Sequence, residues 1–201
     1  MNILKYTSLY SSLLLTACIP SQPISQLGTK PLTSVSNQLK SLNSILSWTI
    51  SGAIAVKNVH KGWSAAINWQ QQGLNQYSIH FMGPLGGGAV SIVNDGHTVN
   101  YQDANKHMSS ENAQQLLREQ TGINLPIQKF FYWMKGQPAP GNIESIERDQ
   151  SNHLVSLQQE GYQVHYFNYT TVNNIDLPGK IQLDGHGITI KLVIKHWLIK
   201  Q

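Results

Sequence analysis

Stretches in which apolar and polar residues alternate, separated by short turn-forming sequences, recur along this chain from residue 48 onward. In residues 63–69, 77–81 and 188–194 the apolar side chains fall on every second position. This period is typical of a β-strand with one buried face, and turns as short as Asn94-Asp95-Gly96 connect antiparallel strands. The pattern therefore predicts a meander of antiparallel strands. It argues against a doubly wound parallel sheet, because strands and helices do not alternate.

The predicted strands fall into two groups along the chain. They lie at residues 48–56, 63–69, 77–81, 90–93 and 98–102, and then at 143–147, 154–159, 162–169, 180–183 and 188–199. Gly52 interrupts the apolar stripe of the first strand and indicates a bulge. In the last strand one face carries Ile188, Ile190, Leu192 and Ile194, and Trp197 is expected on the other face.

Between the two groups the apolar period becomes that of helices. A first helix is expected after a cap at Ser109 or Ser110 and before a stop at Gly122. Residues 127–134 predict a second helix that ends before Gly136, and its four consecutive aromatic residues make it apolar nearly all round. We therefore predict a mainly β fold with inserted helices: a curved antiparallel sheet, or an unclosed barrel, covered by the helix pair.

The only cysteine of the chain, Cys18, follows a short apolar stretch at residues 9–15 and the small residue Ala17. This arrangement resembles the lipobox of bacterial lipoprotein precursors, in which the cysteine is diacylated and becomes the new N-terminus; an ordinary signal peptide or a chance cysteine is the alternative. The predicted division is a signal peptide at residues 1–17, an acylated N-terminus and flexible tether at 18–46, and a folded domain at 47–201. A short helix is expected near residues 36–46. Ile19 in place of an aspartate is compatible with the outer membrane.

The surface is expected to be polar rather than charged, because only 12% of the residues are charged. Five lysines precede Asp95, the first acidic residue, and they are too thinly spread for a nucleic-acid-binding face. A weak attraction to anionic lipid head groups is physically reasonable, and a merely solvated surface is the simpler interpretation.

No catalytic pattern stands out in the sequence. The eight histidines show no metal-site spacing, and we find no Gly-x-Ser-x-Gly motif, phosphate-binding loop or close pair of carboxylates in an apolar setting. Acylation would use the lone cysteine. We therefore expect no enzyme activity, no cofactor and no metal.

A run of backbone-breaking residues separates the strands at 77–81 and 90–93. It reads Gly83-Pro84-Leu85-Gly86-Gly87-Gly88 and should leave the sheet as a loop with Leu85 at its tip. From the spacing alone, Leu85 either folds back onto the core or remains exposed as an apolar probe.

Aromatic residues are expected on strands and helices around the concave face of the sheet. Each one alone is most simply a core residue, but together they suit an apolar cavity for a lipid. They are Trp69, Phe81, Phe130, Trp133, Tyr162, Tyr166 and Trp197.

An ordered series of short motifs resembles the LolB family from about residue 48 to residue 200. The series comprises Trp69-Gln70-Gln71, Gly83-Pro84-Leu85-Gly86, Thr121-Gly122-Ile123-Asn124-Leu125-Pro126, Tyr132-Trp133-Met134-Lys135-Gly136-Gln137-Pro138, Leu177-Pro178 and Trp197. The resemblance implies an outer-membrane lipoprotein, lipid-anchored at Cys18 on the periplasmic face, that accepts acylated lipoproteins from the carrier LolA and inserts them into the outer membrane. It implies a monomer without a nucleic-acid partner. A lipocalin-like module for a free apolar ligand is the alternative, and a purely structural envelope lipoprotein with a solid core is a third hypothesis.

The resemblance also assigns roles to residues of this chain. Gly83, Pro84, Leu85 and Gly86 would form a membrane-insertion loop with Leu85 pointing outward, and the three glycines that follow suggest that it is mobile. The acyl-chain cavity would be lined by Trp69, Ile79, Phe81, Phe130, Trp133, Met134, Tyr162, Tyr166 and Trp197. Tyr162 stands near the place of a fourth family tryptophan, so the cavity differs from the family pattern there.

Overall fold

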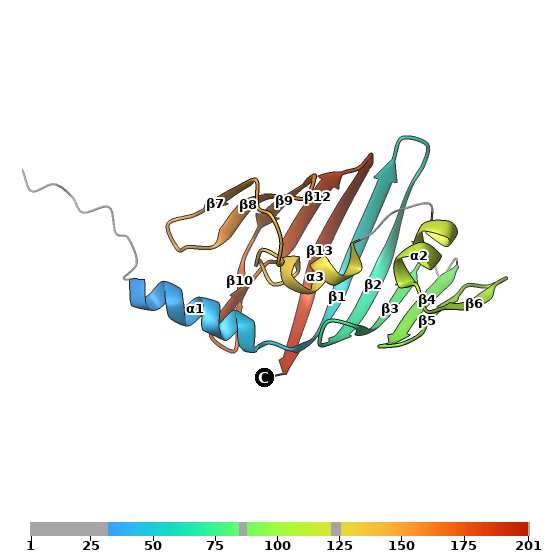
Figure 1. The fold of residues 1–201 in the computed structure, drawn as a ribbon, viewed down its shortest axis with the longest axis horizontal. Helices are drawn as coiled ribbons and strands as arrows, with labels where there is room; N and C mark the ends of the chain where they lie inside the picture. Colours follow the sequence, from blue (N-terminus) through green and yellow to red (C-terminus); the bar gives the residue numbers. More distant parts are fainter. Residues whose placement is uncertain (1–31, 85–87, 122–125, 201) are drawn as a thin grey trace, which may run out of the picture.

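Residues 32–84, 88–121 and 126–200 are described by a computed structural model (Figure 1). The expectations for Cys18, Leu85, Gly86 and the helix stop at Gly122 lie outside these ranges. The described chain is mainly β, as predicted, and its centre is an antiparallel sheet of eleven strands in the order β6-β5-β4-β3-β2-β1-β13-β12-β9-β8-β7. The edge strands β6 and β7 do not pair with each other, so the curved sheet is an unclosed barrel.

The first half of the sheet follows the chain in order. Each of its strands pairs with the next, and the strands are β1 (Ser47–Asn58), β2 (Gly62–Gln72), β3 (Gln76–Met82), β4 (Ala89–Asp95), β5 (Val99–Gln102) and β6 (His107–Ser110). The sequence predicted the first five. It missed β6, a short edge strand whose residues are polar or exposed.

The second half returns to the centre of the sheet. Its strands are β7 (Ser145–Arg148), β8 (Leu154–Gln159), β9 (Tyr162–Phe167), β12 (Lys180–Gly185) and β13 (Ile188–Lys200). The strands β10 (Thr170–Val172) and β11 (Ile175–Leu177) form a separate hairpin that the sequence did not predict. β13 pairs with β1 along the whole length of β1, which joins the two halves.

A register shift between β1 and β13 corrects the predicted position of Trp197. Gly52 pairs with Ile194 and Ser51 with His196, so Lys195 is the extra residue of a bulge. A Cβ at Gly52 would lie only 1.9 Å from the carbonyl oxygen of Val193, which explains why the bulge contains a glycine. The bulge reverses the alternation of β13, and Trp197 therefore lies on the same inner face as Ile194 rather than on the opposite face.

Two helices cover one face of the sheet, as predicted (Figure 1). The first, α2 (Ala113–Thr121), begins later than expected, because Asn112 Oδ1 accepts the backbone N–H of Gln115 (2.9 Å) and is the cap. Ser109 and Ser110, the predicted caps, belong to β6 instead. The second, α3 (Ile127–Trp133), follows Pro126 and crosses the middle of the sheet.

A third helix, α1 (Leu32–Ser44), precedes β1 and begins earlier than the helix expected near residues 36–46. Its last turn is packed against the domain, because Leu42 is buried and Ile45, just beyond the helix, has no exposed surface. The folded unit therefore extends back at least to Leu42.

Candidate functional site: an apolar pocket beneath helix α3

A small pocket lies between the concave face of the sheet and the helix pair. Its volume is about 60 Å³, and all its lining side chains are apolar. The strands contribute Ile54, Val56, Trp63, Ile79, Phe81, Ile92, Ile181, Leu183, Ile190 and Leu192, and the helices contribute Leu117, Ile127, Phe130 and Met134. With no polar group on its walls, this pocket can select a ligand by apolar surface and shape but not by hydrogen bonds.

The strand period explains how the sheet builds this wall. Ile54 and Val56 are on β1, and Ile190 and Leu192 face the same side of β13, where the register pairs Ile54 with Leu192 and Val56 with Ile190. Residues two apart on a strand share a face, so each strand adds a row of branched apolar side chains. The helices provide the roof.

Four of the predicted cavity residues border the pocket: Ile79, Phe81, Phe130 and Met134. The other five pack in the core on the inner side of the sheet but do not line the pocket: Trp69, Trp133, Tyr162, Tyr166 and Trp197. Sequence reasoning missed the aliphatic walls on β1, β12 and β13. Their signal was the alternating stripe itself, which was interpreted only as strand core.

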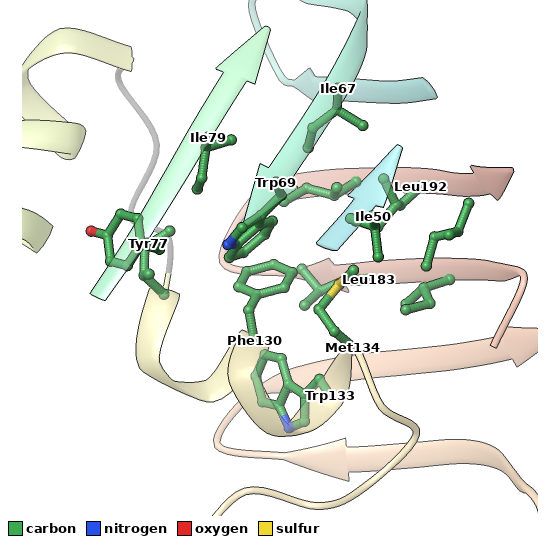
Figure 2. Close-up of a cluster of buried hydrophobic side chains, with 14 of the residues drawn as sticks. Ile50, Ile67, Trp69, Tyr77, Ile79, Phe130, Trp133, Met134, Leu183 and Leu192 are labelled. Carbon is green, nitrogen blue, oxygen red and sulfur yellow. The ribbon is translucent and has the colours of Figure 1, made fainter. Parts of the chain in front are cut away.

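The predicted tryptophans instead form a continuous aromatic cluster beside the pocket. Ring centroids of Trp48 and Trp69 are 5.4 Å apart, those of Trp69 and Phe130 are 5.8 Å apart, and those of Phe130 and Trp133 are 5.8 Å apart. Trp197 meets Trp48 at 5.7 Å. Figure 2 shows Phe130 between Trp69 and Trp133, so α3 inserts one ring into the cluster. Such contacts stabilise the core by about 0.5–1.5 kcal/mol per pair beyond burial.

Two buried glutamines hold the indoles of this cluster in place. Gln71 Oε1 accepts the Nε1–H of Trp69 (2.8 Å), and Gln159 Oε1 accepts that of Trp133 (2.9 Å). Gln159 also accepts the backbone N–H of Ala139 (3.0 Å) and donates to its carbonyl oxygen (2.7 Å). Neither glutamine was singled out from the sequence, because a polar residue within an apolar stripe gives no sign of its partner.

Trp48 Nε1 and Tyr166 Oη are among the buried polar atoms that have no hydrogen-bond partner within the described ranges. Burial raises the pKa of the Tyr166 hydroxyl well above its ordinary value, so the group remains a neutral donor. An unpaired buried donor costs about 1–3 kcal/mol. Trp197, by contrast, donates its Nε1–H to the carbonyl oxygen of Pro178 (3.0 Å).

The lysine that follows α3 is buried without a carboxylate. Lys135 is only 2% exposed, and its Nζ donates to the carbonyl oxygens of Ile45 (3.0 Å) and Leu42 (3.4 Å) at the end of α1. It also lies 4.0 Å from the ring centroid of Phe131. Burial lowers the pKa of Lys135 to about 8. This lysine therefore ties α3 to α1 with charge-assisted hydrogen bonds.

Within the described ranges, no group of three or more histidine, cysteine, aspartate or glutamate side chains is placed to hold a metal ion. The His153 ring lies between two carboxylates, with Nδ1 3.0 Å from Asp149 Oδ2 and Nε2 3.0 Å from Asp176 Oδ2. It does not line the pocket. No described helix is long and apolar enough to cross a bilayer. The pocket thus offers binding surface rather than catalytic groups.

Comparison with known proteins gives consistent relatives. The family model described as "Outer membrane lipoprotein LolB" matches residues 46–197. The outer-membrane lipoprotein LolB of Coxiella burnetii (strain RSA 493) is 35% identical over 157 residues, covering 78% of this chain and 74% of that protein. The LolB of Nitrosococcus oceani is 31% identical over 191 residues and 94% of each chain. The crystal structure of a LolA superfamily protein from Nitrosomonas europaea, 12% identical, covers 83% of this chain and 93% of that chain with a TM-score of 0.53, a likeness of fold alone.

Proposed function

The chain belongs to the LolB family of outer-membrane lipoproteins, and from this premise we propose that it accepts acylated lipoproteins from the periplasmic carrier LolA and inserts them into the outer membrane. The observation that carries the proposal is the wholly apolar pocket beneath α3. The acyl chains of the cargo would occupy it. The protein would act as a monomer, anchored by a lipid on Cys18 after removal of residues 1–17.

The present size of the pocket indicates how it would work. A volume of about 60 Å³ is far below the ~300–1,000 Å³ of typical ligand sites. At this size the pocket is closed, and acyl chains would enter only if the roof moved away from the sheet. Phe130 and Met134 of α3 fill the space that the first methylenes would take.

Transfer of this kind needs no catalytic group and no energy source. Each buried methylene contributes about 0.8 kcal/mol, so several acyl chains cannot cross water alone. A receiving pocket slightly more favourable than the carrier, followed by a bilayer more favourable still, gives the direction. The alternative of a free-ligand module is not favoured by the relatives, which are described as outer-membrane lipoprotein LolB.

The loop after β3 would perform the final step. Gly83, Pro84, Leu85 and Gly86 would present Leu85 to the bilayer, where burying a leucine side chain contributes about 1.5–3 kcal/mol. That is enough to favour contact with the membrane and too little to anchor the protein. The division at residues 17 and 18 and at residues 46 and 47 remains a prediction alongside this role, although Leu42 and Ile45, within the range predicted as tether, are buried against the domain.

The test is Leu85→Glu, with delivery measured separately from receipt. We expect the variant to fold and to take labelled lipoprotein from LolA in solution, while its delivery into vesicles falls at least about tenfold, because a carboxylate replaces an apolar contact. Leu74→Glu is the matched control, since Leu74 is 43% exposed in the turn between β2 and β3. Normal delivery by Leu85→Glu would refute the role of the loop, and failure of the parent to receive cargo would refute the function.

A further inference from the structure

The turn between β1 and β2 carries the most exposed large apolar side chain of the described ranges. Val59 is 82% exposed at its tip. The turn is well formed, because Asn58 Oδ1 accepts the backbone N–H groups of His60 (2.9 Å) and Lys61 (2.8 Å), and Asn58 N donates to the Lys61 carbonyl oxygen (2.9 Å). The exposure of Val59 is therefore built into an ordered turn.

This hairpin tip, defined as residues 57–62, is also cationic. Lys57 and Lys61 flank Val59, both are exposed, and neither forms an ion pair within the described residues. The carboxylate on the neighbouring strands, Asp184, accepts hydrogen bonds from Gln182 (2.8 Å) and Thr189 (2.6 Å). The tip thus presents an apolar point between two free ammonium groups.

The hairpin tip projects beyond the end of the neighbouring strand β3. The last pair of β2 with β3 is Ala66 with Met82, so residues 62–65 have no strand partner on that side among the described residues. In Figure 1 this hairpin lies at the end of the sheet opposite the C-terminus of β13. A protruding apolar and cationic turn can contact a flat surface without unfolding any part of the sheet.

One wall of the pocket ends beside the same tip. Trp63, the residue after it, lines the pocket and is 37% exposed, with its ring 5.7 Å from that of Phe81. A surface that binds this tip is therefore brought to the edge of the pocket.

We propose that the hairpin tip is a membrane-contacting element that docks on anionic phospholipid head groups and turns the mouth of the pocket toward the bilayer. Lysines near an anionic leaflet and a small apolar side chain at its interface are the groups that such a surface attracts. The contact is weak and reversible, which suits a protein whose stable attachment is a lipid. The benefit of turning the pocket toward the bilayer rests on the proposed function, but the affinity of the tip for anionic lipid does not.

A lipid on Cys18 permits this orientation although α1 lies near the other end of the sheet. Residues 19–31 separate Cys18 from α1, and an extended chain of that length spans at most about 45 Å. The twelve residues of β1 span about 40 Å. The anchor is therefore long enough to let either end of the domain face the membrane.

The experiment measures vesicle flotation of the mature chain carrying Cys18→Ser, so that no acyl anchor contributes. Vesicles of phosphatidylethanolamine with phosphatidylglycerol are compared with vesicles of phosphatidylethanolamine with phosphatidylcholine. We expect preference for the anionic vesicles, a loss of about 30-fold in affinity for Lys57→Gln with Lys61→Gln, and about tenfold for Val59→Ser. Binding by the parent should also weaken as salt is added.

The matched control makes the same three chemical changes on the outward face of β13: Val193→Ser, Lys191→Gln and Lys195→Gln, all at exposed positions. It should change vesicle affinity less than about twofold. The proposal is overturned if the control loses as much as the tip variants, or if the tip variants bind like the parent. It is also overturned if they bind vesicles normally but no longer receive cargo from LolA, since the tip would then be a carrier interface. A parent that shows tip-dependent vesicle binding but no cargo transfer would refute the proposed function and support this inference.

Discussion

The two ends of helix α3 are held by different kinds of interaction. At its C-terminal end, Gln137 N donates to Tyr132 O (3.2 Å) and Gly136 N to Trp133 O (3.0 Å), a Schellman motif with Gly136 at a φ of 71°. Buried hydrogen bonds from Trp133 and Lys135 add to it. At the N-terminal end, Pro126 provides no side-chain cap, and Ile127 lines the apolar pocket. The one side-chain hydrogen bond at this end among the described residues is exposed and long, from Gln128 Nε2 to Asn75 Oδ1 (3.5 Å).

The difference indicates which end can move. A buried hydrogen bond that is broken leaves unpaired polar groups, whereas an apolar contact with the sheet can be replaced by one with an acyl chain at little net cost. One exposed ion pair, Lys129 with Glu160, holds the middle of α3, and such pairs contribute little. We therefore expect α3 to open by pivoting about its C-terminal end.

The largest effect should come from removing the anchored end. Trp133→Ala deletes a ring that is 1% exposed and leaves Gln159 Oε1 without the indole donor, so we expect a loss of about 3–5 kcal/mol in the free energy of unfolding. Urea denaturation measures it. Trp63→Ala, which removes the same ring from the mouth of the pocket, is the control and should cost clearly less, because Trp63 is 37% exposed. Equal losses would mean that Trp133 contributes no more to stability than a partly exposed ring, and would remove the argument that the C-terminal end of α3 is anchored.

A smaller effect should appear in the pH dependence of the Lys135 contact. Its pKa of about 8 in the folded protein lies below the ordinary 10.5, so between these pH values the unfolded chain holds a proton that the folded chain has released. Stability should therefore rise from pH 8 toward pH 10.5, by at most about 3 kcal/mol, because the carbonyl acceptors of Leu42 and Ile45 partly favour the charged form.

The check is the unfolding free energy at several pH values for the parent and for Lys135→Met. The variant lacks the titrating group and should not show the rise, while it keeps the apolar stem over Phe131. A rise of the same size in Lys135→Met would mean that another group causes it. The contact between α3 and α1 would then carry no buried charge.

The sheet was predictable because its signal is local. Alternation in residues 63–69 and 188–194 reflects one buried face, and this pattern predicts a strand without knowledge of which elements pack against it. Trp197 was placed wrongly because the bulge at Lys195 depends on pairing with β1, and a one-residue shift reverses every later side chain. Gly52 indicated a bulge in the sequence, but it did not show that the extra residue lies on β13.

The candidate site was less predictable because it depends on which side chains fill the interior. The predicted cavity lining consisted mainly of aromatic residues, but many of their rings pack on one another. The pocket is bordered mainly by branched aliphatic residues such as Ile54 and Leu192. Gln159 could not be assigned a role, because its partners Trp133 and Ala139 lie on other segments of the chain. Gln71 bonds Trp69 on its own strand, but the alternating pattern does not show which polar side chains bond each other. The role of Leu85 comes from family resemblance and remains a prediction.

The smallest effect on stability, and the sharpest test of the movable end, should come from filling the pocket. Ile54 is half-buried in the pocket wall, so Ile54→Phe can extend into the existing space and should change the free energy of unfolding by less than about 1 kcal/mol. The added ring would occupy the place where acyl chains enter, and transfer from LolA, measured with labelled lipoprotein, should fall about tenfold.

Ala55→Phe adds a ring to the opposite, exposed face of the same strand and should leave transfer unchanged. If Ile54→Phe also receives cargo normally, acyl chains do not enter between β1 and α3. Entry through the aromatic cluster around Phe130 would then be the alternative to test. In that case the end of α3 that opens would have to be the end held by Trp133, because Trp133 packs against both Phe130 and Tyr162.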